Sequence, residues 1–140
     1  GFKNNCNRTL AKLVVDYEGL DPKRKLIITG HSLGGATATL IADLLWESGN
    51  RNIALVTAGA PRPGGRKLRK RLEGLEILRF VHGNDIVPNT PPWLVGYVHP
   101  HHKIQLEDIE ETRLDGVTDH NIGDYVKAAE KHFATKKVVL

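Results

Sequence analysis

The chain of 140 residues has no methionine, one cysteine and few aromatic residues, which make up 6% of it. Cys6 has no second cysteine with which to form an internal disulfide, and its apolar spacing favours a small core residue over a reactive thiol. The apolar runs, of which 53–56 is a typical one, are far shorter than the ~20 residues that a membrane-spanning helix needs. With 40% apolar and 26% charged residues, the composition is typical of a single globular domain with a modest core.

The start of the chain shows neither an initiator methionine nor a signal peptide, which would have a charged start, an apolar middle and a small-residue cleavage site. Either an initiator was removed or Gly1 lies inside a longer polypeptide, and we expect the second. The sequence therefore assigns no localisation.

The excess of positive charge, +4 at neutral pH, is concentrated in one short segment. Leucines recur at helical spacing beside these basic residues, which are Arg62, Arg66, Lys67, Arg69, Lys70 and Arg71. The pattern predicts a short helix with a solvated basic face, and a surface attracted to anionic lipid is the alternative. No aromatic residues interleave with the charges and no nucleic-acid-binding signature occurs, so we predict no nucleic-acid partner.

The order of the expected elements indicates an α/β fold. Short apolar runs predict strands buried on both faces, and apolar residues at helical spacing predict amphipathic helices. We expect helices over 6–17, 33–47 and 122–133 and strands over 25–29, 53–57, 75–81 and, less regularly, 103–106. Strands that alternate with helices predict a mostly parallel sheet with helices on both faces.

A G-x-S-x-G segment, Gly30-His31-Ser32-Leu33-Gly34, lies between an expected strand and an expected helix. This is the context of a nucleophile elbow, where a sharp turn exposes the serine hydroxyl and glycines let the chain pass close to itself. We expect Gly30 and Gly34 to provide that room. The backbone amide of Leu33, at the start of the helix, is expected to stabilise an oxyanion.

A serine needs an imidazole to accept its proton, and the imidazole needs a carboxylate to orient it. In this type of fold the three residues follow the chain order serine, acid, histidine. Asp85 follows the third strand, and His120 precedes the last helix. The sequence therefore predicts a catalytic triad of Ser32, Asp85 and His120.

Several segments together make the chain similar to the class 3 lipase family, also called the fungal-type lipase family. The resemblance covers nearly the whole chain and rests on Gly1-Phe2, on 30–35, on Thr57-Ala58-Gly59-Ala60-Pro61-Arg62, on Asp85-Ile86-Val87-Pro88 with Pro91-Pro92, Tyr97 and His99, and on Asp119-His120 with Tyr125. It implies an α/β-hydrolase fold and ester hydrolysis through an acyl-enzyme, without a cofactor. Ala58 departs from the family, which usually has Phe there.

The resemblance also implies what the 140 residues lack, because the family's core begins well upstream of Gly1 with further strands, a lid and a second oxyanion donor. We therefore expect residues 1–140 to form one domain that is incomplete at its amino terminus. An exposed strand edge or apolar face is expected between Ile27 and Ile53, to be covered by a missing segment or by another chain.

Four other histidines are near the predicted acid in the sequence, namely His82, His99, His101 and His102. Their spacing lacks the regular ligand pairs of structural zinc sites, so we predict no metal site. The resemblance implies that His99 supports the acid loop and that His31 packs inside the elbow.

Three functions remain open on the sequence alone. The first is a carboxylic ester hydrolase that acts on acylglycerols, phospholipids or smaller esters at a lipid–water interface. The second is a hydrolase acting on peptides or thioesters, because an elbow and a triad do not encode the leaving group. The third is a non-catalytic binding or structural module, or a truncated inactive fragment of a lipase.

Overall fold

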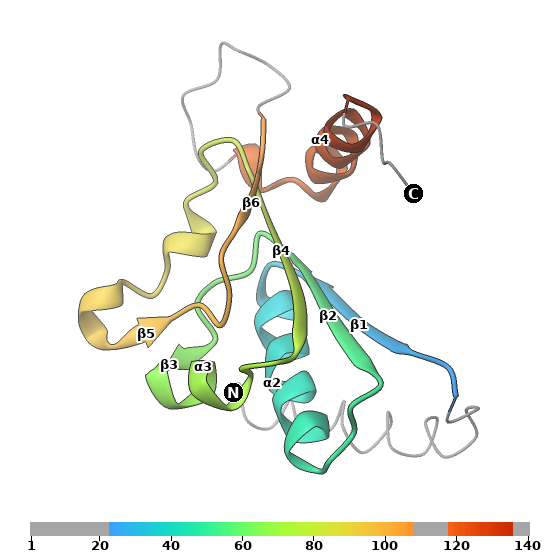
Figure 1. The fold of residues 1–140 in the computed structure, drawn as a ribbon. Helices are drawn as coiled ribbons and strands as arrows, with labels where there is room; N and C mark the ends of the chain where they lie inside the picture. The colour runs from blue at the N-terminus through green and yellow to red at the C-terminus, as the bar shows by residue number, and fades with distance from the viewer. Residues whose placement is uncertain (1–22, 108–117, 136–140) are drawn as a thin grey trace.

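The structure is a computed structural model that describes residues 23–107 and 118–135 (Figure 1), so the helix expected over 6–17 lies outside the described residues. The main sheet has four parallel strands in the order β1-β2-β4-β6, namely β1 (Leu26–His31), β2 (Ile53–Ala58), β4 (Glu76–His82) and β6 (Ile104–Leu106). The first three strands confirm the predicted strands. The fourth strand, β6, confirms the less regular strand expected over 103–106, and it pairs with β4.

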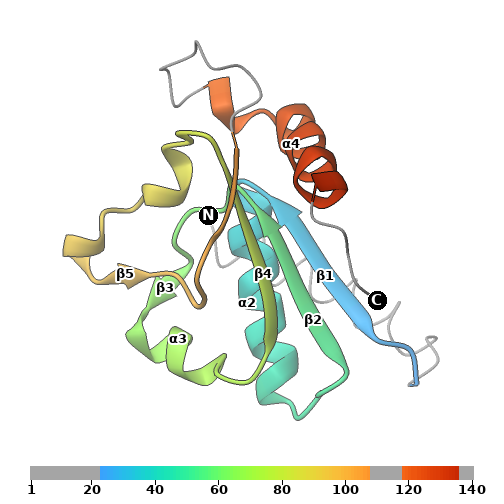
Figure 2. The same cartoon turned by 45° about the horizontal axis from the view of Figure 1, so that its top comes forward.

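Two helices cover opposite faces of this sheet, as Figure 2 shows for α2 (Leu33–Glu47) behind the strands and α4 (Ile122–Thr135) near their upper ends. Residues three apart on a strand point to opposite faces. On β4, Ile77 joins the core under α2, whereas Phe80 packs with Tyr125 and Ala128 of α4. The predicted arrangement of helices on both faces is confirmed.

The larger core lies between α2 and the strands. Small residues on α2, such as Ala38 and Ala42, let the helix sit close to the sheet, and the cluster is Ile28, Ala38, Ile41, Ala42, Ile53, Leu55, Leu68, Leu72, Leu75 and Ile77. Each fully buried leucine or isoleucine contributes about 1.5–3 kcal/mol of burial free energy. This core also includes Leu68 of α3 (Arg66–Arg71), which confirms the predicted short helix with its basic residues outside.

The sequence predicted that the first strand is buried on both faces, and this was wrong. Strand β1 is at the edge of the sheet, and Ile27 is 61% exposed while Ile28 is buried beneath α2. Among the described residues, only the α2 face of this strand is covered. The exposed edge agrees with the expectation of an open face at Ile27, whereas Ile53 at the other limit of that expectation is buried.

A small antiparallel ribbon extends from the main sheet, where the sequence indicated only irregular loops. It pairs β3 (Gly64–Gly65) with β5 (Tyr97–Val98), so that Gly65 lies opposite Tyr97. Single 3-10 turns connect the remaining elements. Two lie between β4 and β5, namely η1 (Val87–Asn89) and η2 (Trp93–Val95), and η3 (Thr118–His120) precedes α4. Strands of two residues are too short to leave a period-two pattern in the sequence.

The turn from β1 into α2 depends on two glycines. A Cβ on Gly30 would lie 2.4 Å from the carbonyl oxygen of Gly34, and a Cβ on Gly35 would lie 2.6 Å from Cβ of Ala60. A Cβ on Gly34 would meet nothing within 4 Å, so the expectation that Gly34 provides room was wrong and Gly35 has that role. It is the backbone of Gly34 that approaches Gly30 closely.

We predict opposite effects of alanine at these neighbouring helix positions. Gly35→Ala should lower the free energy of unfolding by about 1–3 kcal/mol, because the added methyl group overpacks the contact with Ala60. Gly34→Ala should be neutral or stabilising by up to about 1 kcal/mol, because alanine favours a helix over glycine and the space is open. Urea denaturation of both variants measures the difference, and equal effects would contradict the steric assignment.

Candidate active site

The three residues of the predicted triad meet at the carboxyl ends of the parallel strands. Ser32 follows β1, Asp85 lies three residues after β4, and His120 ends η3. Nε2 of His120 is 2.7 Å from Oγ of Ser32, and Nδ1 of His120 is 2.8 Å from Oδ2 of Asp85. The fold therefore brings together side chains that are 35 and 88 positions apart in the sequence.

Ser32 has the strained backbone of an elbow. Its φ of 56° and ψ of −132° make it the one non-glycine residue with positive φ in the described part of the chain. Such a conformation costs of order 1–3 kcal/mol and persists only where its surroundings enforce it. Ser32 caps α2 without using its side chain, so the hydroxyl is directed to His120 instead.

The residue predicted to be an oxyanion donor, Leu33, lies at the start of α2. Leu33 is the first residue of this helix, so its N–H has no intrahelical carbonyl to bond, and the helix dipole makes this end partly positive. The Leu33 side chain is 53% exposed and borders the serine.

Asp85 is held by donors on three sides. Its side chain has no exposed surface, and Oδ1 accepts a hydrogen bond of 2.9 Å from the N–H of Val87. Oδ2 accepts from the hydroxyl of Tyr125 at 2.7 Å as well as facing His120. Burial is the main cause that raises the pKa of Tyr125 above its ordinary range, so the phenol remains a donor at neutral pH. The contact between Tyr125 and the acid has no local signal in the sequence and was not predicted.

Gly59 leaves the space in which this network fits, a role that was not predicted from the sequence. Its φ is +58°, and a Cβ at this position would lie 3.0 Å from both Oδ2 of Asp85 and the hydroxyl of Tyr125. The same atom would be 3.2 Å from Cε1 of His120. A glycine directly after a buried strand was the available signal.

His31 packs against the ring of His120, in agreement with its expected place inside the elbow. The ring centroids are 4.7 Å apart, and Nε2 of His31 donates to the carbonyl oxygen of His120 at 2.9 Å. Burial and then the neighbouring His120 lower the pKa of His31, so its imidazole is neutral at pH 7.

The loop that carries Asp85 is fixed from outside by several side chains. Nε2 of His99 donates to the carbonyl oxygen of Pro88 at 2.7 Å, the contact expected of a residue that supports the acid loop. Arg62 donates to the carbonyl oxygens of Asn89 and Pro91. From the far end of the chain, the carboxylate of Asp119 accepts the N–H of Asn84 at 2.7 Å. The contacts of Arg62 and Asp119 were missed, because they link segments far apart in the sequence.

Within residues 23–107 and 118–135, no three His, Cys, Asp or Glu side chains lie close enough together to hold a metal ion. What the arrangement can do is transfer a proton from a hydroxyl to an imidazole whose other nitrogen faces a buried carboxylate.

Comparison with known proteins identifies the family. A family model described as Lipase (class 3) matches residues 1–95. The lipase of Rhizopus niveus is 41% identical over 85 residues, which cover 56% of this chain and 22% of that protein. The chloroplastic phospholipase A1-Igamma2 of Arabidopsis thaliana is 34% identical over 112 residues, which cover 71% of this chain and 21% of that protein.

The solved structures agree with the sequence relatives. The lipase from Rhizopus microsporus var. chinensis aligns with a TM-score of 0.69 and 28% identity, over 86% of this chain and 51% of that chain. The chain thus spans about a fifth of the length of the two sequence relatives and about half of the solved lipase. Because the family model covers well over half of the 140 residues, including the elbow and the acid loop, the chain belongs to the class 3 lipase family and has its α/β-hydrolase fold.

Proposed function

We propose that this protein is a serine carboxylic ester hydrolase in which Ser32, His120 and Asp85 form the catalytic triad. The observation that carries the proposal is the unbroken chain of hydrogen bonds from Ser32 through His120 to Asp85, with distances of 2.7 and 2.8 Å. Both distances are within the range of a competent proton relay.

In the proposed reaction, Oγ of Ser32 attacks the carbonyl carbon of an ester while Nε2 of His120 takes the hydroxyl proton. The oxyanion that forms accepts a hydrogen bond from the N–H of Leu33. Collapse of this intermediate breaks the bond to the alcohol, which leaves with the proton from His120, and the acyl group stays on Ser32. Water, deprotonated by His120, then attacks the acyl-enzyme and releases the acid and the free serine.

An acyl-lipid substrate suits the apolar rim of the site. Leu33 and Ile86, each next to a triad residue, expose 53% and 50% of their surface. Relatives that are named lipases and a phospholipase A1 support acylglycerols or phospholipids over peptides. An acyl-chain-length series on the protein distinguishes a lipase from an esterase of short acids.

The first test concerns the nucleophile. Ser32→Ala should abolish covalent labelling by a fluorophosphonate, because the atom that would attack phosphorus is gone. Ser48→Ala, at the exposed end of α2, is the matched control and should label as the wild type does. Labelling that survives in a folded Ser32→Ala variant would exclude Ser32, and would favour a non-catalytic module if no ester is turned over.

The second test compares two histidines of the same region. His120→Ala should lower kcat by about 10³-fold or more without unfolding the protein, because it removes the proton carrier. His99→Ala should have a smaller effect that follows loss of stability, because His99 contacts the acid loop and not the serine. Turnover and thermal midpoint are measured together, and a larger loss of turnover in a folded His99→Ala variant would reverse the assignment.

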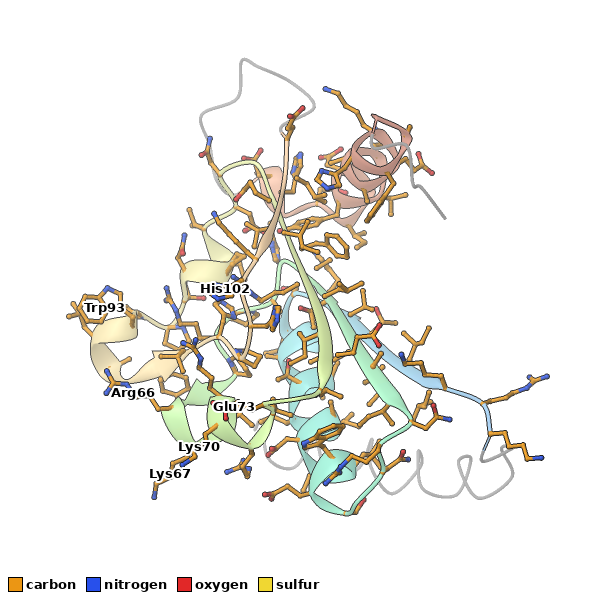
Figure 3. All side chains as sticks on the ribbon, in the orientation of Figure 1. Arg66, Lys67, Lys70, Glu73, Trp93 and His102 are labelled. Atoms are coloured by element: carbon orange, nitrogen blue, oxygen red, sulfur yellow. The ribbon has the colours of Figure 1, made fainter. Side chains whose placement is uncertain are left out.

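We also propose that the protein docks on lipid through a patch formed by η2 and α3, which we call the docking patch. Trp93, Leu94 and Val95 are 68%, 76% and 63% exposed. The β3–β5 ribbon holds them beside α3, and Figure 3 shows Trp93 and Arg66 extending on the same side of the molecule as Lys67 and Lys70. Within the described residues, no carboxylate pairs with the cations of the patch, which are Arg66, Lys67, Arg69 and Lys70.

Exposed tryptophan and aliphatic side chains beside these cations suit the boundary of an anionic lipid surface. No helix among the described residues is long and apolar enough to cross a bilayer. The docking patch supports the lipid alternative that the sequence left open for the basic segment.

The docking patch predicts two separable effects on vesicle binding. Trp93→Ala should weaken binding to phosphatidylcholine vesicles with or without phosphatidylserine, whereas Lys67→Gln should weaken binding about fivefold only when phosphatidylserine is present. Val126→Ser and Lys127→Gln on α4 are matched controls of exposed apolar and charged residues. Vesicle sedimentation measures binding, and equal losses in the controls would refute the docking patch.

Finally, we propose that residues 1–140 are part of a single α/β-hydrolase domain whose sheet continues beyond β1. The open edge of β1 and the exposed Ile27 support this, as does the length of the relatives. Further strands, from the same polypeptide or another chain, would cover this face and bring a second oxyanion donor. Loss of one such donor costs about 10²–10³ in rate, so an isolated fragment would be a weak enzyme.

A further inference from the structure

A cavity of about 300 Å³ lies behind the acid loop, and the reaction above does not use it. Its lining includes Arg79 and Val81 of β4, Asp85 and Pro88 of the acid loop, and His99 and Lys103 of the segment before β6. Neither Ser32 nor His120 lines it. The volume is at the lower end of the ~300–1,000 Å³ typical of small-molecule sites.

Arg79 is the unusual residue of this cavity. It is only 8% exposed, yet its one hydrogen bond within the described residues runs from Nε to the carbonyl oxygen of His101, at 3.2 Å. No carboxylate there is within ion-pair distance of its guanidinium. Burial, and then repulsion from Arg62, lower the pKa of Arg79 to about 10, so it is still charged at pH 7.

Cationic side chains outnumber carboxylates in the lining of the cavity. Arg62 and Lys103 add positive charge to the lining. Asp85 is the acid among the lining residues, but Oδ1 is bonded to Val87 and Oδ2 to His120 and Tyr125. A buried charge without a partner costs several kcal/mol, so the cavity is electrostatically incomplete.

His99 adds an acceptor to this set of donors. Because its Nε2 faces the carbonyl oxygen of Pro88, Nε2 carries the hydrogen and Nδ1 is the acceptor. Nδ1 is buried and has no hydrogen-bond partner among the described residues. Burial, followed by repulsion from Arg79, lowers the pKa of His99 to about 4, which keeps this acceptor unprotonated at neutral pH.

We propose that this cavity binds a small oxyanion, and specifically a phosphate group that still carries a proton. The free edge of the Arg79 guanidinium would bind two phosphate oxygens, Lys103 and Arg62 would add charge, and Nδ1 of His99 would accept the phosphate hydroxyl. Cationic donors with one acceptor suit hydrogen phosphate, which keeps a hydroxyl at pH 7. Sulfate and a phosphodiester headgroup lack that hydroxyl at pH 7.

The test measures phosphate binding in the Ser32→Ala variant, so that ester hydrolysis does not contribute. The protein tested carries whatever sequence naturally flanks the 140 residues. Sodium phosphate at pH 7 should raise the thermal midpoint in a saturable way relative to sodium chloride of equal ionic strength. Sulfate and glycerophosphocholine should bind more weakly, which distinguishes free phosphate from a phospholipid headgroup.

Three variants test whether phosphate binds in this cavity. Arg79→Gln should weaken phosphate binding at least tenfold. It should also raise the thermal midpoint in sodium chloride, because a buried charge without an ion-pair partner among the described residues is removed. If Arg79 were purely structural, the substitution would lower that midpoint. Lys103→Gln, at an exposed position, should weaken binding several-fold, and Lys67→Gln on α3 is the matched control without effect. If Arg79→Gln does not fold, the comparison of Lys103→Gln with Lys67→Gln decides. The proposal is overturned if the wild type shows no saturable response or if every pocket variant that folds responds as Lys67→Gln does.

Discussion

The site depends on one steric constraint, the close passage of the chain between β1 and α2. Gly30 and the backbone of Gly34 approach so closely that no side chain fits, and Gly35 packs with equal tightness against Ala60. This passage forces Ser32 to a positive φ and turns its hydroxyl away from the helix cap. The N–H of Leu33, the first of α2, and the hydroxyl of Ser32 therefore lie next to each other.

The site also requires a buried carboxylate that protein groups hold in place. Asp85 is fully buried, and it is ordered by a backbone N–H, a tyrosine hydroxyl and an imidazole from three separate segments. Gly59 keeps the space for those groups free, and the arginine and histidine contacts behind the loop hold its carbonyls. Precision at the site thus comes from long-range contacts rather than from the elbow alone.

Sequence patterns were sufficient for the elements and for the three residues that meet, because apolar runs, a glycine-flanked serine and chain order are local signals. They misplaced the tight glycine, since Gly34 and Gly35 are adjacent and only the packing of Ala60 distinguishes them. They also predicted burial of β1 on both faces, because the run 26–28 is apolar although Ile27 is exposed. The contact of Tyr125 with Asp85 spans 40 positions and leaves no local pattern.

The open edge of β1 has a consequence for how activity and assembly are related. The strand whose outer side lacks a neighbour among the described residues is also the strand that ends at the elbow. Any segment that adds to this edge would act on Ser32 through the length of a single strand, without touching the site. Nucleophile reactivity is then a sensitive reporter of whether the sheet has been completed.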